Sequence, residues 1–164
     1  AVWRNGMGWF PVMDLGRAEK TRLRILGLDV GSKTIGMAVS DELELIAHAL
    51  ATLQRKGMER DLRELAAVIQ EQEIGTVVVG LPKNMNGSLG PSAEMALDLV
   101  RALEQNTQLP VLTWDERLST VAAEKALLEG DMSRKKRKKV IDQVAAVLIL
   151  QGYLDCRANT RGRS

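Results

Sequence analysis

The spacing of apolar residues predicts three short strands near the start of the chain. Apolar residues run almost without interruption from Ile25 to Val30, as in a strand that is covered on both faces. A second apolar segment, 35–39, follows the sequence Gly-Ser-Lys-Thr, so we predict two strands joined by a tight turn at 31–34. Residues 44–53 predict a third strand, and the short connections favour an antiparallel arrangement.

After residue 54 the pattern changes to helices that alternate with single strands. Apolar residues at helical spacing predict an amphipathic helix over 59–73 and another around 93–103. Strands are predicted over 75–82 and 110–116, and the last two helices over 119–129 and about 140–154. This order predicts an α/β fold, in which a mixed five-stranded sheet (three antiparallel strands, then two parallel strands) is flanked by helices.

The two ends of the chain lack this periodicity. Residues 1–21 contain no apolar signal-peptide region, so we expect a flexible extension or a remnant of an expression vector. We assign residues 22–156 to one folded domain and residues 157–164 to a basic tail.

Composition excludes several kinds of site. Of the 164 residues, 45% are hydrophobic, which is enough for one domain with its own core. A single cysteine, Cys156, and a single histidine, His48, rule out a disulfide framework, a cysteine metal site and a Ser-His-Asp triad. No apolar run is long enough to cross a bilayer, and we expect a protein of the reducing cytoplasm.

Carboxylates occupy positions where the pattern predicts burial. Asp29 interrupts the first strand, where it would either bind a cation or cap the following turn. Asp115 and Glu116 end the last strand on opposite faces, so at most one of them joins Asp29 and the other would pair with Arg117. Asp142 begins the apolar stripe of the last helix, where it would either face the sheet or cap the helix.

An acid from each of these three elements would form a site of hard oxygen ligands for Mg²⁺ or Mn²⁺. A pair of such ions can activate a water molecule and stabilise the leaving oxygen in phosphodiester hydrolysis.

The positive charge of the chain is concentrated near its end. The net charge is +2, but residues 130–164 hold nine Lys/Arg and three Asp/Glu, which gives +6. Six consecutive cations repel one another, so we expect a polyanionic partner such as nucleic acid. Lys33 in the tight turn would either contact a phosphate or face solvent. The candidate substrate-binding residues are Lys33, Arg117, Arg134, Lys135, Lys136, Arg137, Lys138 and Lys139.

Four motifs in this order resemble the YqgF family, also called RuvX. They are GLDVGSKTIGMAVSD at 27–41, VGLPKNMNGS at 79–88, DERLST at 115–120 and IDQVAAVLILQ at 141–151. Members of that family are described as Holliday junction resolvases or as nucleases that trim the 5′ end of pre-16S ribosomal RNA. The resemblance implies an RNase H-like nuclease domain and a metal-dependent acidic site, which we transfer to Asp29, Glu116 and Asp142.

The expected function is metal-dependent hydrolysis of nucleic-acid phosphodiesters, above all at the 5′ end of pre-16S rRNA. One alternative is Holliday junction resolution, for which symmetric cutting of two strands favours a homodimer. Another is a non-catalytic RNA-binding module of ribosome assembly. A P-loop is excluded because only three residues separate Gly27 from Gly31, and an ATP site of the actin or sugar-kinase kind would need a second domain.

Overall fold

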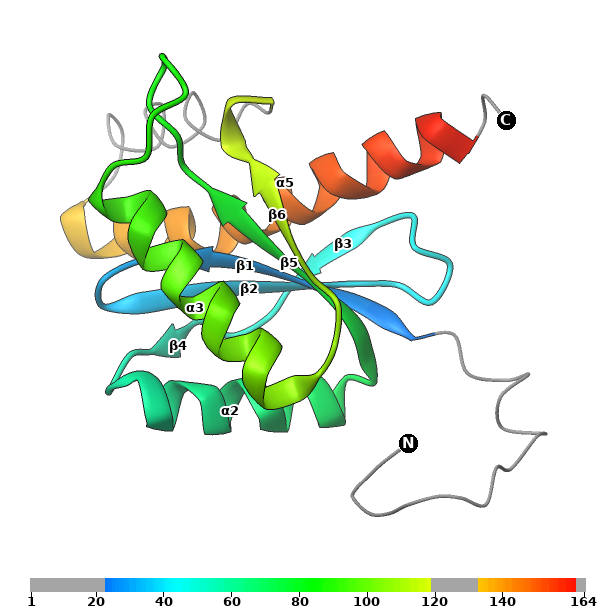
Figure 1. Cartoon of the computed structure of the whole chain (residues 1–164), viewed down its shortest axis with the longest axis horizontal. Coiled ribbons are helices and arrows are strands. Elements are labelled where there is room, and N and C mark those ends of the chain that lie inside the picture. The colour runs from blue at the N-terminus through cyan, green and yellow to red at the C-terminus, as the bar shows by residue number, and fades with distance from the viewer. Residues whose placement is uncertain (1–22, 119–132, 162–164) are drawn as a thin grey trace.

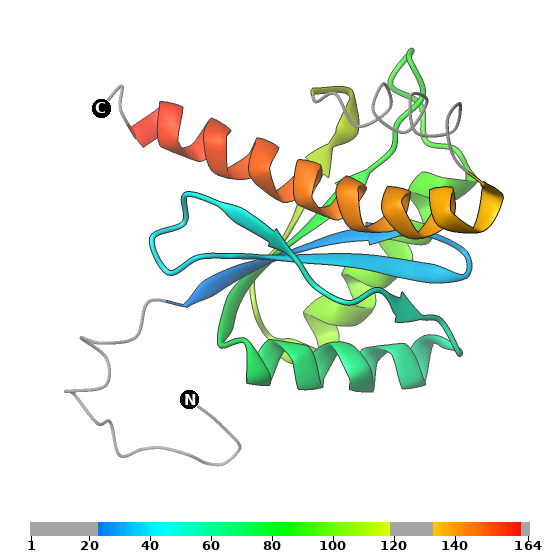
Figure 2. The same cartoon turned by 180° about the vertical axis from the view of Figure 1, so that it is seen from behind.

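The computed structural model of the protein describes residues 23–118 and 133–161. The extension predicted over 1–21 and the helix predicted over 119–129 lie outside these residues. Within the described part of the chain, a six-stranded sheet separates one long helix from two others (Figures 1 and 2). The elements in chain order are β1 (Arg24–Val30), β2 (Thr34–Ser40), β3 (Ala47–Ala49), β4 (Leu53–Gln54), α2 (Met58–Glu71), β5 (Ile74–Leu81), α3 (Pro91–Thr107), β6 (Val111–Asp115), the 3₁₀ turn η1 (Glu116–Leu118) and α5 (Arg134–Arg161).

The strand order confirms the predicted mixed sheet. The strands follow each other as β3-β2-β1-β5-β6, and the short β4 pairs with β2. β1 and β3 are antiparallel to β2, whereas β5 is parallel to both β1 and β6. The parallel strands place their carboxyl ends at one edge of the sheet, which is where ligands bind in α/β folds.

The third predicted strand is interrupted. β3 and β4 both pair with β2, but residues 50–52 between them belong to no strand. At the other end, the Asp41 carboxylate accepts hydrogen bonds from the amides of Leu45 and Ile46 and holds this segment in a turn. The prediction of one continuous strand over 44–53 is therefore wrong, because a side chain takes the backbone donors that its first residues would need.

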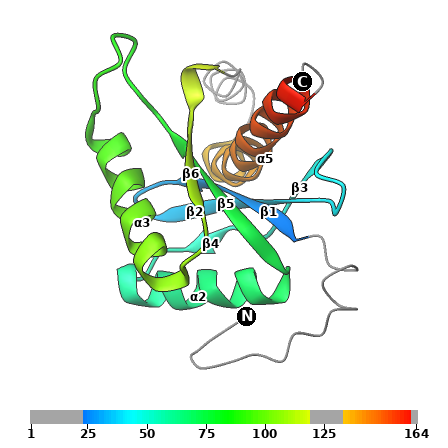
Figure 3. The ribbon, with the colours of Figure 1, turned by 45° about the vertical axis from the view of Figure 1, so that its right-hand side comes forward.

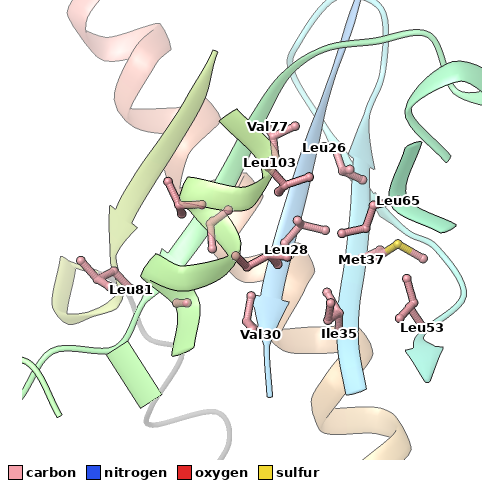
Figure 4. Packing of buried hydrophobic residues seen from close by; sticks show 14 of the residues in the cluster. Leu26, Leu28, Val30, Ile35, Met37, Leu53, Leu65, Val77, Leu81 and Leu103 are labelled. Carbon is pink, nitrogen blue, oxygen red and sulfur yellow. The ribbon is translucent and has the colours of Figure 1, made fainter. Parts of the chain in front are cut away.

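Helices cover both faces of the sheet (Figure 3), and each face buries an apolar cluster of its own. The larger cluster lies under α2 and α3 and contains Leu28 and Val30 of β1 with Leu65, Leu99 and Leu103 of the helices. Figure 4 shows how side chains of β1, β2 and β5 converge there with those of the helices. The smaller cluster lies under α5 and is formed mostly by Ile25, Ala38, Val78, Ala145, Ala146, Ile149, Leu150 and Leu154.

Helix α5 is longer than the sequence predicts at both ends. It begins at Arg134, so the basic run forms its first turns, whereas the predicted helix begins after that run. It continues to Arg161, through residues that we assigned to the tail. Lys and Arg are good helix formers, and no proline interrupts the segment, so the charged flanks extend the helix. Among the described helices, α5 included, none has the length and apolar character that a membrane span requires.

Candidate active site

Asp29 lies on the face of the sheet that α5 covers. Its neighbours Leu28 and Val30 belong to the cluster under α2 and α3, and side chains alternate between the faces of a strand. Ile25, which shares the face of Asp29, packs in the cluster under α5. The residue is half-buried and lies one position before the end of β1, so its carboxylate belongs to the carboxyl edge of the sheet.

Gly80 makes room for a second carboxylate on the same face. The parallel register of β1 and β5, continued by one residue, sets Asp29 beside Gly80. A Cβ atom placed at Gly80 would lie 3.5 Å from Cδ of Glu116 and would overlap the side chain of Ile149 from α5. Glu116 is only 8% exposed. The missing side chain at Gly80 therefore lets the Glu116 carboxylate lie against the sheet, one strand away from Asp29.

Asp115 lies on the opposite face from Glu116. Trp114 packs edge-on against Tyr153 of α5, with ring centroids 6.4 Å apart, so alternation turns the next side chain away from α5. The Asp115 carboxylate accepts hydrogen bonds from Nη2 of Arg117 at 2.7 Å and from its Nε at 3.1 Å. These hydrogen bonds lower the pKa of Asp115 to about 2. Of the two acids, the structure puts Glu116 on the face of Asp29.

Arg117 connects the end of β6 to a neighbouring loop. Its guanidinium is held by Asp115, and its Nη1 lies 3.5 Å from the carbonyl oxygen of Met85. Met85 belongs to a hairpin closed by a bridge between Lys83 and Leu89. Arg117 therefore has an observed contact on the protein, and its predicted role in substrate binding stays a prediction.

The backbone of α5 brings its N-terminal end to the same edge of the sheet (Figures 1 and 2). A Cβ atom placed at Gly27 of β1 would lie 3.3 Å from the carbonyl oxygen of Ala146 and 2.7 Å from Cβ of Leu150, so helix and sheet are in close contact here. Asp142 precedes the buried Ala145 and Ala146 by about one turn. The structure places Asp142 by its backbone, within the first three turns of α5; its side chain lies outside the described atoms.

The candidate cations lie around this edge. Lys33 is exposed in the turn between β1 and β2. The basic run, 134–139, forms the start of α5, and Lys136 within it is exposed. Lys33 thus lies four residues after Asp29, and the basic run ends three residues before Asp142.

The donor set fits a hard divalent cation. Carboxylate oxygens are the ligands that Mg²⁺ and Mn²⁺ prefer, and Asp29 and Glu116 supply them from adjacent parts of one face. Among the described side chains, no three acids, histidines or cysteines gather as a complete metal site. Two of the three predicted carboxylates, those of Asp29 and Glu116, thus lie on one face at the same edge of the sheet. The part of Asp142 in this site stays a prediction.

A cavity of about 650 Å³ lies elsewhere, between β6 and the C-terminal half of α5. Its lining includes Trp114, Tyr153 and Cys156 and neither Asp29 nor Glu116. This cavity is therefore separate from the candidate active site.

Gly80 is a site residue whose role the sequence analysis missed. An isolated glycine inside a strand of β-branched residues is a signal for the close approach of another group. That signal was present between Val79 and Leu81, but it does not say which group approaches.

Comparison with known proteins places the chain in a family. The sequence profile of RuvX, described as Holliday junction resolvase, matches residues 23–156. A protein of Clostridioides difficile (strain 630) named "Putative pre-16S rRNA nuclease" is 56% identical over 137 residues, which cover 84% of this chain and 97% of that protein. A protein of the same name from Clostridium kluyveri (strain ATCC 8527) is 54% identical over 133 residues, which cover 81% of this chain and 97% of that protein.

Solved structures agree on the fold. RuvC of T. thermophilus, in complex with a Holliday junction substrate, superposes with a TM-score of 0.55 at 17% identity and covers 84% of this chain and 97% of its own. A structure of Thermus thermophilus RuvC gives a TM-score of 0.53, also at 17% identity, over 84% of this chain and 98% of its own. The predicted RNase H-like fold and the resemblance found in the motifs are both confirmed. The chain belongs to the RuvX family.

Proposed function

We propose that this protein is a metal-dependent endonuclease that hydrolyses nucleic-acid phosphodiesters, and that its natural substrate is the 5′ end of pre-16S rRNA. The observation that carries the proposal is the pair of carboxylates, Asp29 and Glu116, on one face at the carboxyl edge of the sheet. Family membership and the names of the relatives at 56% and 54% identity support the same conclusion.

Asp29, Glu116 and Asp142 would hold Mg²⁺ or Mn²⁺. Such an ion would supply Lewis-acid chemistry at the scissile phosphate and would make water a stronger nucleophile. Glu116 is buried against Gly80, which restricts its carboxylate, and the ladder of β1 holds the backbone of Asp29. Lys33, exposed in the adjoining turn, is available to neutralise a phosphate oxygen of the substrate.

The basic start of α5 supports a nucleic-acid substrate. Positive side chains are unfavourable in the first turn of a helix, because they add to the positive end of the macrodipole. Helix α5 nevertheless begins with six cations and has no acid in its first turn. This charge does not stabilise the helix, and it produces a positive potential suited to a phosphate backbone. Arg117, braced by Asp115, would extend this surface on the other side of the acids.

A four-way DNA junction is the second candidate substrate. The printed description of the matching family, Holliday junction resolvase, favours it. A resolvase cuts two strands symmetrically, so this alternative implies that the protein acts as a homodimer. Either substrate would be met in the cytoplasm, where we expect the protein to work.

The proposal is tested by cleavage of three substrates: a pre-16S leader transcript, a four-way junction and a linear duplex, each with Mg²⁺, Mn²⁺ or a chelator. We expect the transcript to be cut at a defined 5′ position only when metal is present, and Asp29→Asn to bind it without cutting. If the protein is a dimer and cuts the junction faster than the transcript, its substrate is branched DNA and not pre-16S rRNA. Equal activity of the wild type and Asp29→Asn, or binding without cutting by both, would reject the metal mechanism.

A further inference from the structure

A buried ion pair lies next to the turn that follows Asp29. The Asp61 carboxylate of α2 is completely buried, and Nε of Arg55 donates a hydrogen bond to its Oδ2 at 3.0 Å. The amide of Lys56 donates to Oδ1 at 2.9 Å, so both carboxylate oxygens have partners. A buried acid with both oxygens bound fixes the position and orientation of the guanidinium that pairs with it.

Arg55 uses two further donors on the turn between β1 and β2. Its Nη1 donates to the carbonyl oxygen of Gly31 at 3.0 Å, and its own amide donates to the carbonyl oxygen of Lys33 at 2.8 Å. Inside the turn, the amide of Gly31 donates to the carbonyl of Thr34 at 2.8 Å. Two of the carbonyls in a four-residue turn are thus held by one arginine.

This turn connects directly to two candidate site residues. Gly31 comes two residues after Asp29, and Lys33 lies within the turn itself. The turn lies at the same edge of the sheet as the start of α5 (Figure 2). We propose that Arg55, itself oriented by Asp61, is a positioning residue of the nuclease: it fixes the turn and thereby the directions in which Asp29 and Lys33 point. The inference rests on the proposed nuclease function.

Stability alone does not explain an ion pair at this place. A buried pair of charges can often be replaced by well-packed apolar residues of similar volume without loss of stability, because the desolvation of the charges offsets their attraction. The surroundings are suited to such a replacement, since the buried Leu53 and the partly buried Met58 flank this segment and belong to the large apolar cluster. What an apolar pair cannot supply is a donor for the Gly31 carbonyl. A guanidinium can serve two acceptors in fixed directions, which a lysine cannot do.

Two variants separate positioning from stability. Arg55→Lys keeps the positive charge opposite Asp61 but removes the planar guanidinium, which donates to two acceptors in fixed directions. The double variant Arg55→Met/Asp61→Leu removes both charges and restores an apolar interior. The matched controls are Arg63→Lys and Arg63→Met/Glu59→Leu, because this exposed ion pair, at 3.2 Å, lies on the same helix α2.

The measurements are thermal unfolding, kcat and KM for metal-dependent cleavage, and hydrogen exchange of the amides of Gly31 and Arg55. We expect the double variant to unfold only slightly below the wild-type temperature, because removal of the two desolvated charges offsets most of the cost of the Lys56 amide and the Gly31 carbonyl, which lose their partners. We expect its kcat to fall by up to about 100-fold with a smaller change in KM, because the reacting groups are misaligned and not lost. Both amides should exchange at least about tenfold faster, because the turn loses a charged hydrogen bond. The control variants should leave all three measurements unchanged.

The proposal is overturned if the double variant regains wild-type stability together with wild-type kcat and exchange. If the double variant does not fold, Arg55→Lys decides in the same way. If the wild type itself cleaves none of the substrates, the proposed nuclease function fails by that result. Exchange in Arg55→Lys then decides the inference about the turn: faster exchange at Gly31 supports it, and an unchanged rate rejects it.

Discussion

The two faces of the sheet differ in how closely their helices approach the strands. Under α2 and α3, the strands and helices meet through large aliphatic residues such as Leu28, Leu65 and Leu103. Under α5, small residues stand among the large ones: Gly27 and Gly80 on the strands lie close to α5, and Ala145 and Ala146 are buried on the helix. The first arrangement buries the most apolar area, which stabilises the fold. The second lets a helix approach the sheet closely, and thus holds the start of α5 near the carboxylates.

This difference explains why the candidate acids lie under α5. A face filled with large apolar side chains leaves no volume for a carboxylate and its ligand. At Gly80, the space of a missing side chain is shared by Ile149 and the Glu116 carboxylate. We infer that the α2 and α3 face serves mainly stability and that the carboxyl edge of the α5 face serves chemistry.

Adjacent residues of β1 give the strongest test of this division, because Leu28 and Asp29 point to opposite faces. We expect Asp29→Asn to reduce cleavage by about 1000-fold or more, since several kcal/mol of transition-state stabilisation depend on a bound metal. Its free energy of unfolding should change little, because asparagine keeps the size of the side chain and one hydrogen-bonding oxygen. Leu28→Ala should do the reverse: it should lower the free energy of unfolding by about 2–5 kcal/mol. Cleavage by the molecules that remain folded should stay near the wild-type rate.

Urea unfolding and steady-state cleavage, measured on the same preparations, check both changes. The division between the faces fails if Asp29→Asn costs as much stability as Leu28→Ala, or if both variants cut at the wild-type rate.

Gly80→Ala tests the close approach under α5. The added Cβ would overlap Cδ1 of Ile149 and lie 3.5 Å from Cδ of Glu116. We expect a loss of about 1–3 kcal/mol in the free energy of unfolding, as for other overpacked cores. Cleavage should also fall, because either α5 or the Glu116 carboxylate must move.

A second substitution provides the control for Gly80→Ala. Ile149→Val removes the Cδ1 atom that the new methyl group would overlap. Combined with Gly80→Ala, it should recover part of the stability and part of the activity. If the double variant is less stable than Gly80→Ala alone, then room for α5 is not the reason for a glycine at position 80.

Much of the fold could be predicted because each local signal agreed with the sheet. The apolar run of β1, the glycine turn after it and the β-branched residues of β5 gave the central strands directly. The start of α5 was missed because a basic run is compatible both with a solvent-exposed loop and with a helix of good helix formers. The late start of β3 depends on the Asp41 turn, whose carboxylate takes the amides of Leu45 and Ile46 that the predicted strand would have used.

The candidate site was predictable only in part. Alternation separates Asp115 from Glu116, but the side that each takes depends on Trp114 packing under α5, a tertiary contact. The hydrogen bond from Arg55 to Gly31 joins residues that are 24 positions apart, and no local sequence pattern predicts it. Contacts between distant residues decide such details, and periodicity reports only on neighbours.

The basic run offers a test with a smaller effect. We expect replacement of three lysines by alanine to weaken RNA binding and to reduce the slope of log affinity against log salt concentration by about 2 to 3. The helix should be at least as stable, because alanine has a higher helix propensity and the cations oppose the macrodipole. Titrations at several salt concentrations measure the slope. The lysines are Lys135, Lys136 and Lys138.

A control of equal charge comes from the opposite face. Three exposed arginines of α2 and α3 should change the slope far less when they are replaced by alanine, because they lie under the sheet, away from the start of α5 (Figure 3). Equal slopes for the two triple variants would mean that net charge, and not its location, governs binding. The arginines are Arg60, Arg63 and Arg101.

The smallest expected effect concerns pH and the pair Asp115–Arg117. The hydrogen bonds from Arg117 lower the pKa of Asp115 from 3.8 to about 2, so the folded state holds this proton less tightly than the unfolded state. The pair therefore stabilises the fold fully above pH 4 and loses its contribution as the pH falls from about 4 to about 2. Carbon-13 NMR of the Asp115 carboxyl should give a midpoint near 2 in the wild type and near 3.8 in Arg117→Ala. A wild-type midpoint near 3.8 would mean that Arg117 does not bind the Asp115 carboxylate in solution. The contact by which Arg117 connects η1 to the loop of Met85 would then lose its support.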